Sequence, residues 1–191
     1  MDTLLSIFLG IGLSAATGFR VFVPLLIMNI AAQMGHLQLA PGFEWIGSTT
    51  ALIVLGVAAV IEILGYFIPW LDNLLDSIAT PTAVIAGVIV SASVFSDMSP
   101  LLKWALAIIL GGGTAALVQG TTVVTRAAST ATTGGCANPA VAIVELLGST
   151  LLSILAIALP LVAGLVVFGL IYFGGKKVTE RIVKRRSSNS A

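Results

Sequence analysis

The chain has 191 residues, of which 58% are hydrophobic and only 9% are charged, with a formal net charge of +1 and a mean hydropathy of +1.10. A soluble domain is usually about a quarter charged, so this composition excludes an ordinary soluble fold. Apolar runs of roughly 20 residues match the ~30 Å hydrocarbon thickness of a bilayer. The sequence therefore predicts an all-α, polytopic transmembrane helix bundle.

The first apolar stretch, Leu4 to Ala32, is too long for one untilted span and is interrupted by Gly18, Arg20 and Pro24. Proline lacks an amide hydrogen and crowds the carbonyl four residues earlier, here that of Arg20. We expect an interrupted or re-entrant helix pair in residues 4–32, with the break near a buried arginine.

Three later helices are predicted from a polar residue that precedes proline, a combination typical of a helix start. The span Thr49 to Ile68 comes before them and carries Glu62. A long span that includes Pro160 comes after them, and this proline should kink the helix. The expected segments after Thr49–Ile68 are Pro81 to Phe95, Pro100 to Val124, Pro139 to Leu147 and Ser149 to Phe173.

These segments give a bundle of five or six membrane helices in residues 1–174, with a second interrupted or re-entrant region in residues 130–147. The glycines Gly111, Gly112 and Gly113 lie inside a span and lack the Lys-Ser/Thr of a phosphate loop. Close helix packing explains them best. The glycine-rich stretch from Gly111 to Gly120 also suits close contacts within or between chains, and we expect a homodimer.

The C-terminal tail, residues 175–191, is basic and partly disordered in this interpretation. It holds six of the nine Lys and Arg residues. The positive-inside bias predicts a multi-pass protein of the cell inner membrane with a cytoplasmic C-terminus, and the tail should contact membrane lipids. A nucleic-acid partner is not expected for charges placed beside a membrane.

No cofactor or metal is expected, because the single cysteine, Cys136, and the single histidine, His36, form no group with zinc-ligand spacing. An intramembrane enzyme would need a nucleophile with a base, or a metal cluster, in one cavity. The sequence offers no such array, so we expect a protein that is not an enzyme.

Four ionisable residues lie within apolar segments: Arg20, Glu62, Arg126 and Glu145. Each costs roughly 2.5 to 3.5 kcal/mol on insertion scales, so each needs a partner, a cavity or a function. The arginines can bind an anion while Glu62 and Glu145 couple or gate its movement. All four can instead form structural ion pairs.

The segment from Arg126 to Pro139 is small, hydroxyl-bearing and glycine-rich, and it ends where a helix is predicted to begin. A helix N-terminus offers free amides and a positive dipole to an anion. An ordinary external loop is the alternative. The candidate substrate-binding residues are Arg20, Arg126, Thr133, Gly134, Gly135 and Asn138.

Asp72 and Asp76 lie four residues apart after Pro69 and form a candidate acidic interfacial site. Solvated carboxylates at the membrane surface are the simpler interpretation. A divalent cation would need a third convincing acidic ligand, and none follows from the sequence.

Three motifs, GFRVFVPLL from Gly18 to Leu26, the acidic and proline array from Glu62 to Pro81, and the Asn-Pro…Glu element from Asn138 to Glu145, resemble the bacterial membrane family called domain of unknown function 4126. The resemblance covers roughly residues 5 to 170 and implies a small inner-membrane protein. It implies no substrate, because the family has no established activity. This chain departs from the pattern of similar members at two places. Those members have a lysine ahead of the residue that matches Arg126, and they have two acidic residues where this chain has Glu145 followed by Leu146.

Two functional hypotheses follow. The first is a secondary transporter or lipid carrier for an anionic small molecule or lipid headgroup, including a lipid phosphate. The second is a non-transporting membrane scaffold or assembly factor whose buried charges only fix the packing of its helices.

Overall fold

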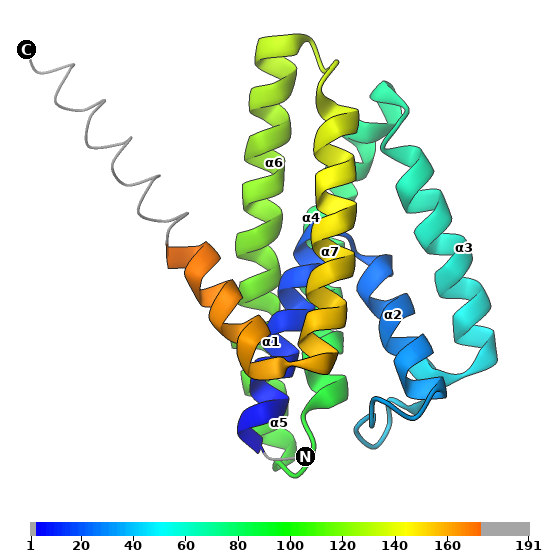
Figure 1. The fold of residues 1–191 in the computed structure, drawn as a ribbon, viewed down its shortest axis with the longest axis vertical. Coiled ribbons are helices and arrows are strands. Elements are labelled where there is room, and N and C mark those ends of the chain that lie inside the picture. Colours follow the sequence, from blue (N-terminus) through cyan, green and yellow to red (C-terminus); the bar gives the residue numbers. More distant parts are fainter. Residues whose placement is uncertain (1–2, 173–191) are drawn as a thin grey trace, which may run out of the picture.

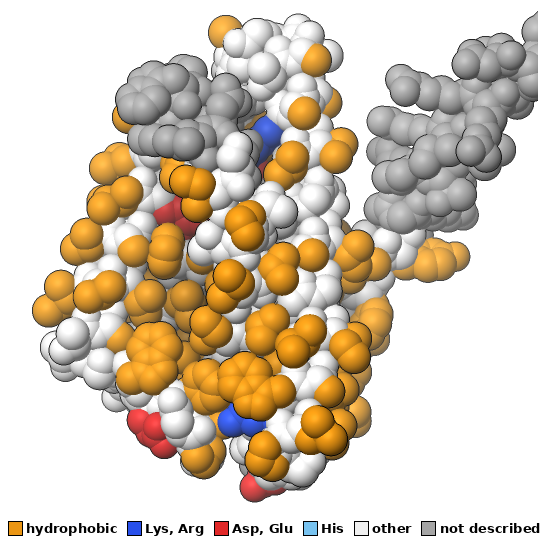
Figure 2. All heavy atoms as spheres, turned by 180° about the vertical axis from the view of Figure 1, so that it is seen from behind, with side chains coloured by type: hydrophobic (Ala, Val, Ile, Leu, Met, Phe, Trp, Pro, Cys, Tyr) orange, Lys and Arg blue, Asp and Glu red, His pale blue; other side chains and the backbone are white. Residues whose placement is uncertain are grey.

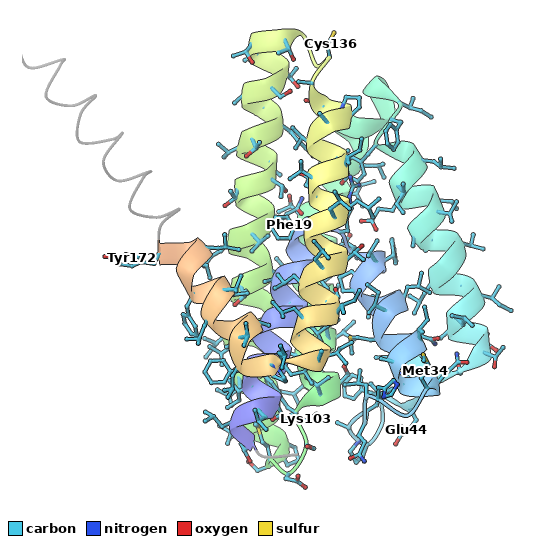
Figure 3. The ribbon with its side chains drawn as sticks, viewed as in Figure 1. Phe19, Met34, Glu44, Lys103, Cys136 and Tyr172 are labelled. Carbon is cyan, nitrogen blue, oxygen red and sulfur yellow. The ribbon has the colours of Figure 1, made fainter. Side chains whose placement is uncertain are left out.

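The computed structural model describes residues 3–172, except for the side chains of residues 69–74 and 76. The described chain is helical throughout, with short connections and no strand between residues 3 and 172. The predicted all-α helix bundle is confirmed. Figures 1 and 3 show an upper end, marked by Cys136, and a lower end, marked by Met34, Glu44 and Lys103.

The first two helices form a hairpin that enters and leaves from the lower end. Helix α1 (Thr3–Phe19) rises to about mid-height, where Figure 3 places Phe19, and α2 (Phe22–Gln33) returns to the lower end. The helix breaks at Arg20. Pro24 falls in the first turn of α2, where its missing N–H costs no helical hydrogen bond. The predicted interruption in residues 4–32 is confirmed.

The remaining helices alternate in direction (Figure 1). A loop with a short 3₁₀ turn, η1 (Glu44–Gly47), leads into α3 (Thr49–Gly65), and α4 (Pro69–Val94) returns to the lower end. Next come α5 (Pro100–Leu106), a π-helical turn η2 (Ala107–Gly112) and α6 (Gly113–Thr133), which ascend together. Helix α7 (Asn138–Ala158) descends, and a final apolar helix spans Pro160–Tyr172.

The predicted helix start at Pro81 is wrong, because Pro81 lies inside α4 and the helix begins at Pro69. An interior proline removes one backbone hydrogen bond. Beside it, the Thr82 hydroxyl donates to the Ile78 carbonyl at 2.7 Å, a side-chain bond within the same turn. The Thr80-Pro81 pair has the composition of a cap and proline start, but the tertiary structure keeps the helix continuous.

Two further predicted boundaries are corrected at the upper end. The segment after Arg126 is not irregular, because α6 continues to Thr133 and ends at Gly134, which adopts the left-handed conformation with φ 63°. The helix predicted from Pro139 to Leu147 continues to Ala158. The interruption in residues 130–147 is therefore a tight turn, residues 134–137, between two long helices.

The last predicted span, Ser149 to Phe173, is also divided differently. Its first part belongs to α7, and the chain breaks at Leu159, whose φ and ψ of −139° and 71° are not helical. Pro160 then begins a new helix, so this proline ends one helix and starts the next. The tail, residues 175–191, and the end of this predicted span lie outside the described residues.

Helix α1 is the centre of the bundle, and small residues let other helices approach it and each other. The Ser14 hydroxyl donates to the Gly87 carbonyl of α4 at 2.8 Å. A Cβ added at Gly87 would lie 2.8 Å from the Gly111 carbonyl oxygen, and one at Gly112 would lie 2.9 Å from a Val88 methyl. Close packing at Gly111 and Gly112 is confirmed, whereas Gly113 faces open space.

The outer surface is apolar, as Figure 2 shows for one face. Within the described residues, three helical segments are long and apolar enough to cross a membrane, Ser77–Val94, Pro100–Thr133 and Asn138–Ala158, and four shorter apolar helices accompany them. At 1.5 Å per residue, α7 is about 31 Å long, close to the ~30 Å hydrocarbon core. Exposed Trp45 and Trp104 lie near the lower end, as expected at a membrane interface. The described helices are compatible with a membrane protein.

Candidate functional site

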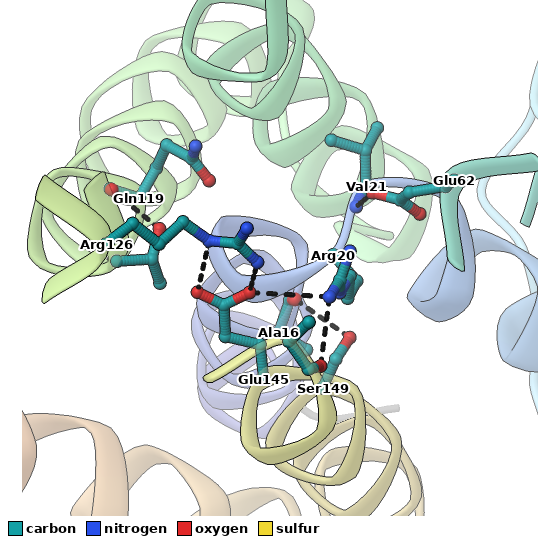
Figure 4. A network of polar contacts seen from close by, with 10 residues as sticks. Ala16, Arg20, Val21, Glu62, Gln119, Arg126, Glu145 and Ser149 are labelled. Atoms are coloured by element: carbon teal, nitrogen blue, oxygen red, sulfur yellow. Dashed lines mark hydrogen bonds and ion pairs between the residues drawn. The ribbon is translucent and has the colours of Figure 1, made fainter. Parts of the chain in front are cut away.

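Arg20, Arg126 and Glu145 meet in the upper half of the bundle (Figure 4). Arg126 of α6 binds Glu145 of α7 through two parallel hydrogen bonds, Nε to Oε1 at 3.1 Å and Nη2 to Oε2. Arg20 Nη2 lies 3.5 Å from Oε2 of the same carboxylate. All three side chains are almost completely buried. One glutamate therefore neutralises two guanidinium groups, but it binds Arg126 far more closely than Arg20.

Tyr66, just beyond the end of α3, supports both arginines. The Cζ atoms of Arg20 and Arg126 lie 3.9 and 4.0 Å from the centroid of its ring. A buried aromatic face attracts a guanidinium electrostatically, and desolvation strengthens the attraction. Tyr66 therefore helps to hold two like charges close to a single carboxylate.

Glu62, one helical turn before Tyr66, does not join Glu145. Its Oε1 accepts from the Val21 amide at 2.7 Å, and its Oε2 accepts from the Phe22 amide at 3.0 Å. These amides form the start of α2, where N–H groups have no helical acceptor and the helix dipole is positive. Glu62 thus caps α2 from a neighbouring helix and fixes the tip of the α1–α2 hairpin.

Arg20 is only partly satisfied. Its Nη2 donates to the Ala142 carbonyl at 2.9 Å. Its Nε and Nη1 are buried and have no hydrogen-bond partner in the described part of the chain. These two atoms carry three of the five donor hydrogens of a guanidinium. A buried charged donor without an acceptor raises the free energy of the folded protein. Within the cluster, Arg20 is therefore the residue that can bind an additional acceptor.

The cluster lies below the upper end of the bundle. Seven residues separate Arg126 from the end of α6 at Thr133, and seven separate Glu145 from the start of α7 at Asn138. At 1.5 Å per residue, the cluster is about 10 Å below the turn. In Figure 2, small acidic and basic areas lie recessed between apolar side chains in this upper half.

The other predicted substrate-binding residues lie at the turn and not in the cluster. Thr133 ends α6, and its hydroxyl donates to the Ser129 carbonyl at 2.8 Å. Gly134 and Gly135 form the turn with positive φ. Asn138 begins α7 and donates to the Thr130 hydroxyl at 3.2 Å. The structure therefore brings Arg20, Arg126 and Glu145 together and places the turn residues about 10 Å away.

The predicted acidic site is only partly visible. Asp72 and Asp76 belong to α4, but their side chains lie outside the described residues. Among the described residues, no group of three or more His, Cys, Asp and Glu side chains forms a candidate metal site. The roles of Asp72 and Asp76 stay predictions.

Sequence reasoning missed Tyr66 and the Ala142 carbonyl. Glu62 and Tyr66 are four residues apart, so they share one face of a helix, and this spacing could have identified the tyrosine. The Ala142 contact has no comparable signal, because every residue has a carbonyl. Only the packing of the hairpin tip against α7 selects this one.

Comparisons with known proteins agree with the sequence motifs. Residues 7–177 match the family described as "Domain of unknown function (DUF4126)", which spans most of the chain and includes all four buried charges. No curated protein and no solved structure matches. The chain belongs to the DUF4126 family.

Proposed function

We propose that this protein binds an anionic small molecule or lipid headgroup at Arg20 and moves it as a secondary transporter or lipid carrier. The single observation that carries the proposal is the buried Arg20 guanidinium, 2% exposed, whose Nε and Nη1 have no acceptor among the described residues. Leaving such donors unpaired costs about 1 to 3 kcal/mol or more. An anion that accepts from them removes this cost.

The neighbouring residues take distinct roles in this proposal. Arg126 is occupied by Glu145, so it holds the carboxylate in place and adds positive charge behind the bound anion. Glu145 is 3.5 Å from Arg20, a loose ion pair that an incoming anion can replace. Glu62 fixes the hairpin tip beside Arg20 and is the gating residue, because its release would free the start of α2.

The expected environment is the cell inner membrane, with a cytoplasmic C-terminus, membrane lipids as partners and a homodimer as the assembly. These expectations rest on the basic tail and on the glycine-rich stretch of the sequence.

A membrane scaffold is the second candidate, and specific contacts favour it. The two parallel bonds between Arg126 and Glu145, and the capping of α2 by Glu62, are sufficient structural reasons to retain three of the four charges. Arg20 also contacts protein groups, but within the described part of the chain two of its nitrogen atoms have no acceptor. The two candidates therefore differ in the role that they give to Arg20.

The test is thermal unfolding of the purified protein in an uncharged detergent, with inorganic phosphate, sulfate and short alkyl phosphates as probes. A ligand that binds the native state stabilises it by about 2.7 kcal/mol at one hundred times its Kd. We expect at least one probe to stabilise wild type and Lys103→Gln but not Arg20→Gln. Lys103 is the matched control, because it is a cation of the lower end, beside Phe43.

The scaffold candidate gives a different pattern. No probe then stabilises wild type, and Arg20→Gln unfolds at a lower temperature with or without anions. If one probe does bind through Arg20, uptake of that radiolabelled anion into proteoliposomes separates a transporter from a protein that only binds.

A further inference from the structure

A groove runs between α2 and α7 in the lower half of the molecule and has a volume of about 540 Å³. This volume is within the range of ligand pockets in proteins. Its walls are apolar except at two positions. Ile27, Ile30, Ala31 and Met34 line one side, and Ile154, Ile157 and Ala158 line the other, with Thr150 and His36 as the polar members.

The α7 wall of the groove lies below the contact with Arg20. Thr150, Ile154, Ile157 and Ala158 lie one to four residues apart and line the groove from one side of the helix. Ala142, about two turns before Thr150, supplies the carbonyl that binds Arg20. The groove and the arginine therefore contact the same helix at different heights.

The α2 wall lies below Arg20 in the same way. Ile27, Ile30 and Met34 lie three or four residues apart and line the groove, and Arg20 lies in the break just before α2. The seam between α2 and α7 thus has at its upper end a buried guanidinium with two nitrogen atoms that find no acceptor among the described residues, and further down an apolar groove. An anion at one end and an apolar chain along the rest would match both parts.

We infer that the ligand is a membrane lipid with a phosphate-type headgroup, whose headgroup binds Arg20 and whose chain lies in the α2–α7 groove. This inference rests on the proposed function, because it names the ligand class of the same site. The headgroup supplies the affinity through charge-assisted hydrogen bonds. The groove contributes little to the affinity, because lipid tails are as apolar as leucine and moving an acyl chain from the bilayer into an apolar groove gains little free energy. Its role is to fix where the chain lies.

The experiment therefore measures where the chain lies. The probe is dodecyl phosphate with a photoactivatable diazirine near the chain end, added to the protein in phosphatidylcholine nanodiscs. The control probe has the same chain and a zwitterionic phosphocholine headgroup. Peptide mass spectrometry then locates the label.

We expect the phosphate probe to label residues 27–34 and 150–158. Arg20→Gln should reduce this labelling about tenfold or more, because a tenfold loss of affinity corresponds to the loss of one charge-assisted hydrogen bond. The phosphocholine probe should label exposed apolar positions such as those of α3, and Arg20→Gln should not change that pattern.

A second pair of variants tests the groove without altering the charge cluster. Ala158 is exposed and lines the groove, whereas Ala105 is exposed on α5 and does not. Ala158→Trp should reduce groove labelling by the phosphate probe, and Ala105→Trp should leave it unchanged.

Equal groove labelling by both probes, or labelling that neither Arg20→Gln nor Ala158→Trp reduces, would overturn the inference. If inorganic phosphate still stabilises the protein through Arg20 in that case, the proposed function stands and the ligand is a free anion. If Arg20-dependent stabilisation is also absent, both proposals fail.

Discussion

Replacing Glu145 should destabilise the protein more than replacing Arg126, although the two form one ion pair. Glu145→Gln leaves both Arg126 and Arg20 without their shared carboxylate in the buried cluster. Breaking a buried ion pair by removing one partner typically costs about 3 to 5 kcal/mol. We expect a loss in this range for Glu145→Gln.

Arg126→Gln should cost less, because Glu145 keeps a positive partner. Arg20 Nη2 lies 3.5 Å from its Oε2, and the new glutamine amide can donate one bond in place of the guanidinium. The expected loss is about 1.5 to 3 kcal/mol, the value of hydrogen bonds to a charged group. The double variant should lose less than the sum, with a coupling of about 0.5 to 3 kcal/mol.

The assay is reversible unfolding by sodium dodecyl sulfate in mixed micelles, followed by circular dichroism. Glu44→Gln is the matched control, since Glu44 is exposed in the lower loop and should change the free energy of unfolding by no more than about 0.5 kcal/mol. Equal losses for Glu145→Gln and Arg126→Gln, or a larger loss for Arg126→Gln, would refute the view that Glu145 neutralises both arginines.

Three other predictions follow from the packing, the hairpin tip and the membrane arrangement. Gly87→Ala should lower the free energy of unfolding by about 1 to 3 kcal/mol in the same assay, because the new methyl would lie 2.6 Å from a neighbouring Cβ. Gly56→Ala is the control and should not lower it, because a Cβ added there has nothing within 4 Å. Glu62→Gln should weaken the cap of α2 by about 1 to 2 kcal/mol, seen as faster hydrogen exchange at residues 21 and 22; unchanged exchange there would contradict the capping role. Cys136 is free and exposed at the upper end, opposite to Glu44. An impermeant maleimide should label Cys136 from one side of the membrane, and in a Cys136→Ser background it should label Glu44→Cys from the other side. Labelling of both positions from the same side would contradict the placement of the two ends on opposite sides of a membrane.

The fold class and the hairpin break could be predicted from the sequence because they depend on strong local signals. A high apolar content and runs of about 20 residues leave only a helical bundle compatible with a bilayer. A glycine, an arginine and a proline within seven residues, 18–24, interrupt the first stretch, and the chain breaks there.

Helix boundaries at proline were less predictable, because the same dipeptide can begin a helix or lie inside one. Ser99-Pro100 begins α5, with the Ser99 hydroxyl as its cap. Thr80-Pro81 lies within α4, where tertiary packing preserves the helix. Helix α7 runs through Gly148 for a similar reason, since its buried face packs against α1 over most of its length.

The members of the charge cluster were predictable, but their pairing was not. An ionisable residue in an apolar segment is unusual enough to identify all four from the sequence. Which carboxylate binds which arginine depends on how distant helices cross. Glu62 lies on α3, one turn before Tyr66, yet it binds backbone amides. Counting two acids and two bases therefore does not reveal that two nitrogen atoms of Arg20 have no acceptor among the described residues.

The most direct test of the anion site is an experimental structure determined with selenate, a tetrahedral anion whose selenium is located by anomalous scattering. Arg20 is the predicted binding residue, so the anomalous peak should lie within hydrogen-bond distance of its Nε or Nη1, and Arg126 and Glu145 should stay paired. A structure in which both nitrogen atoms bond to protein groups, with no selenium peak beside Arg20, would contradict the proposal and favour the scaffold.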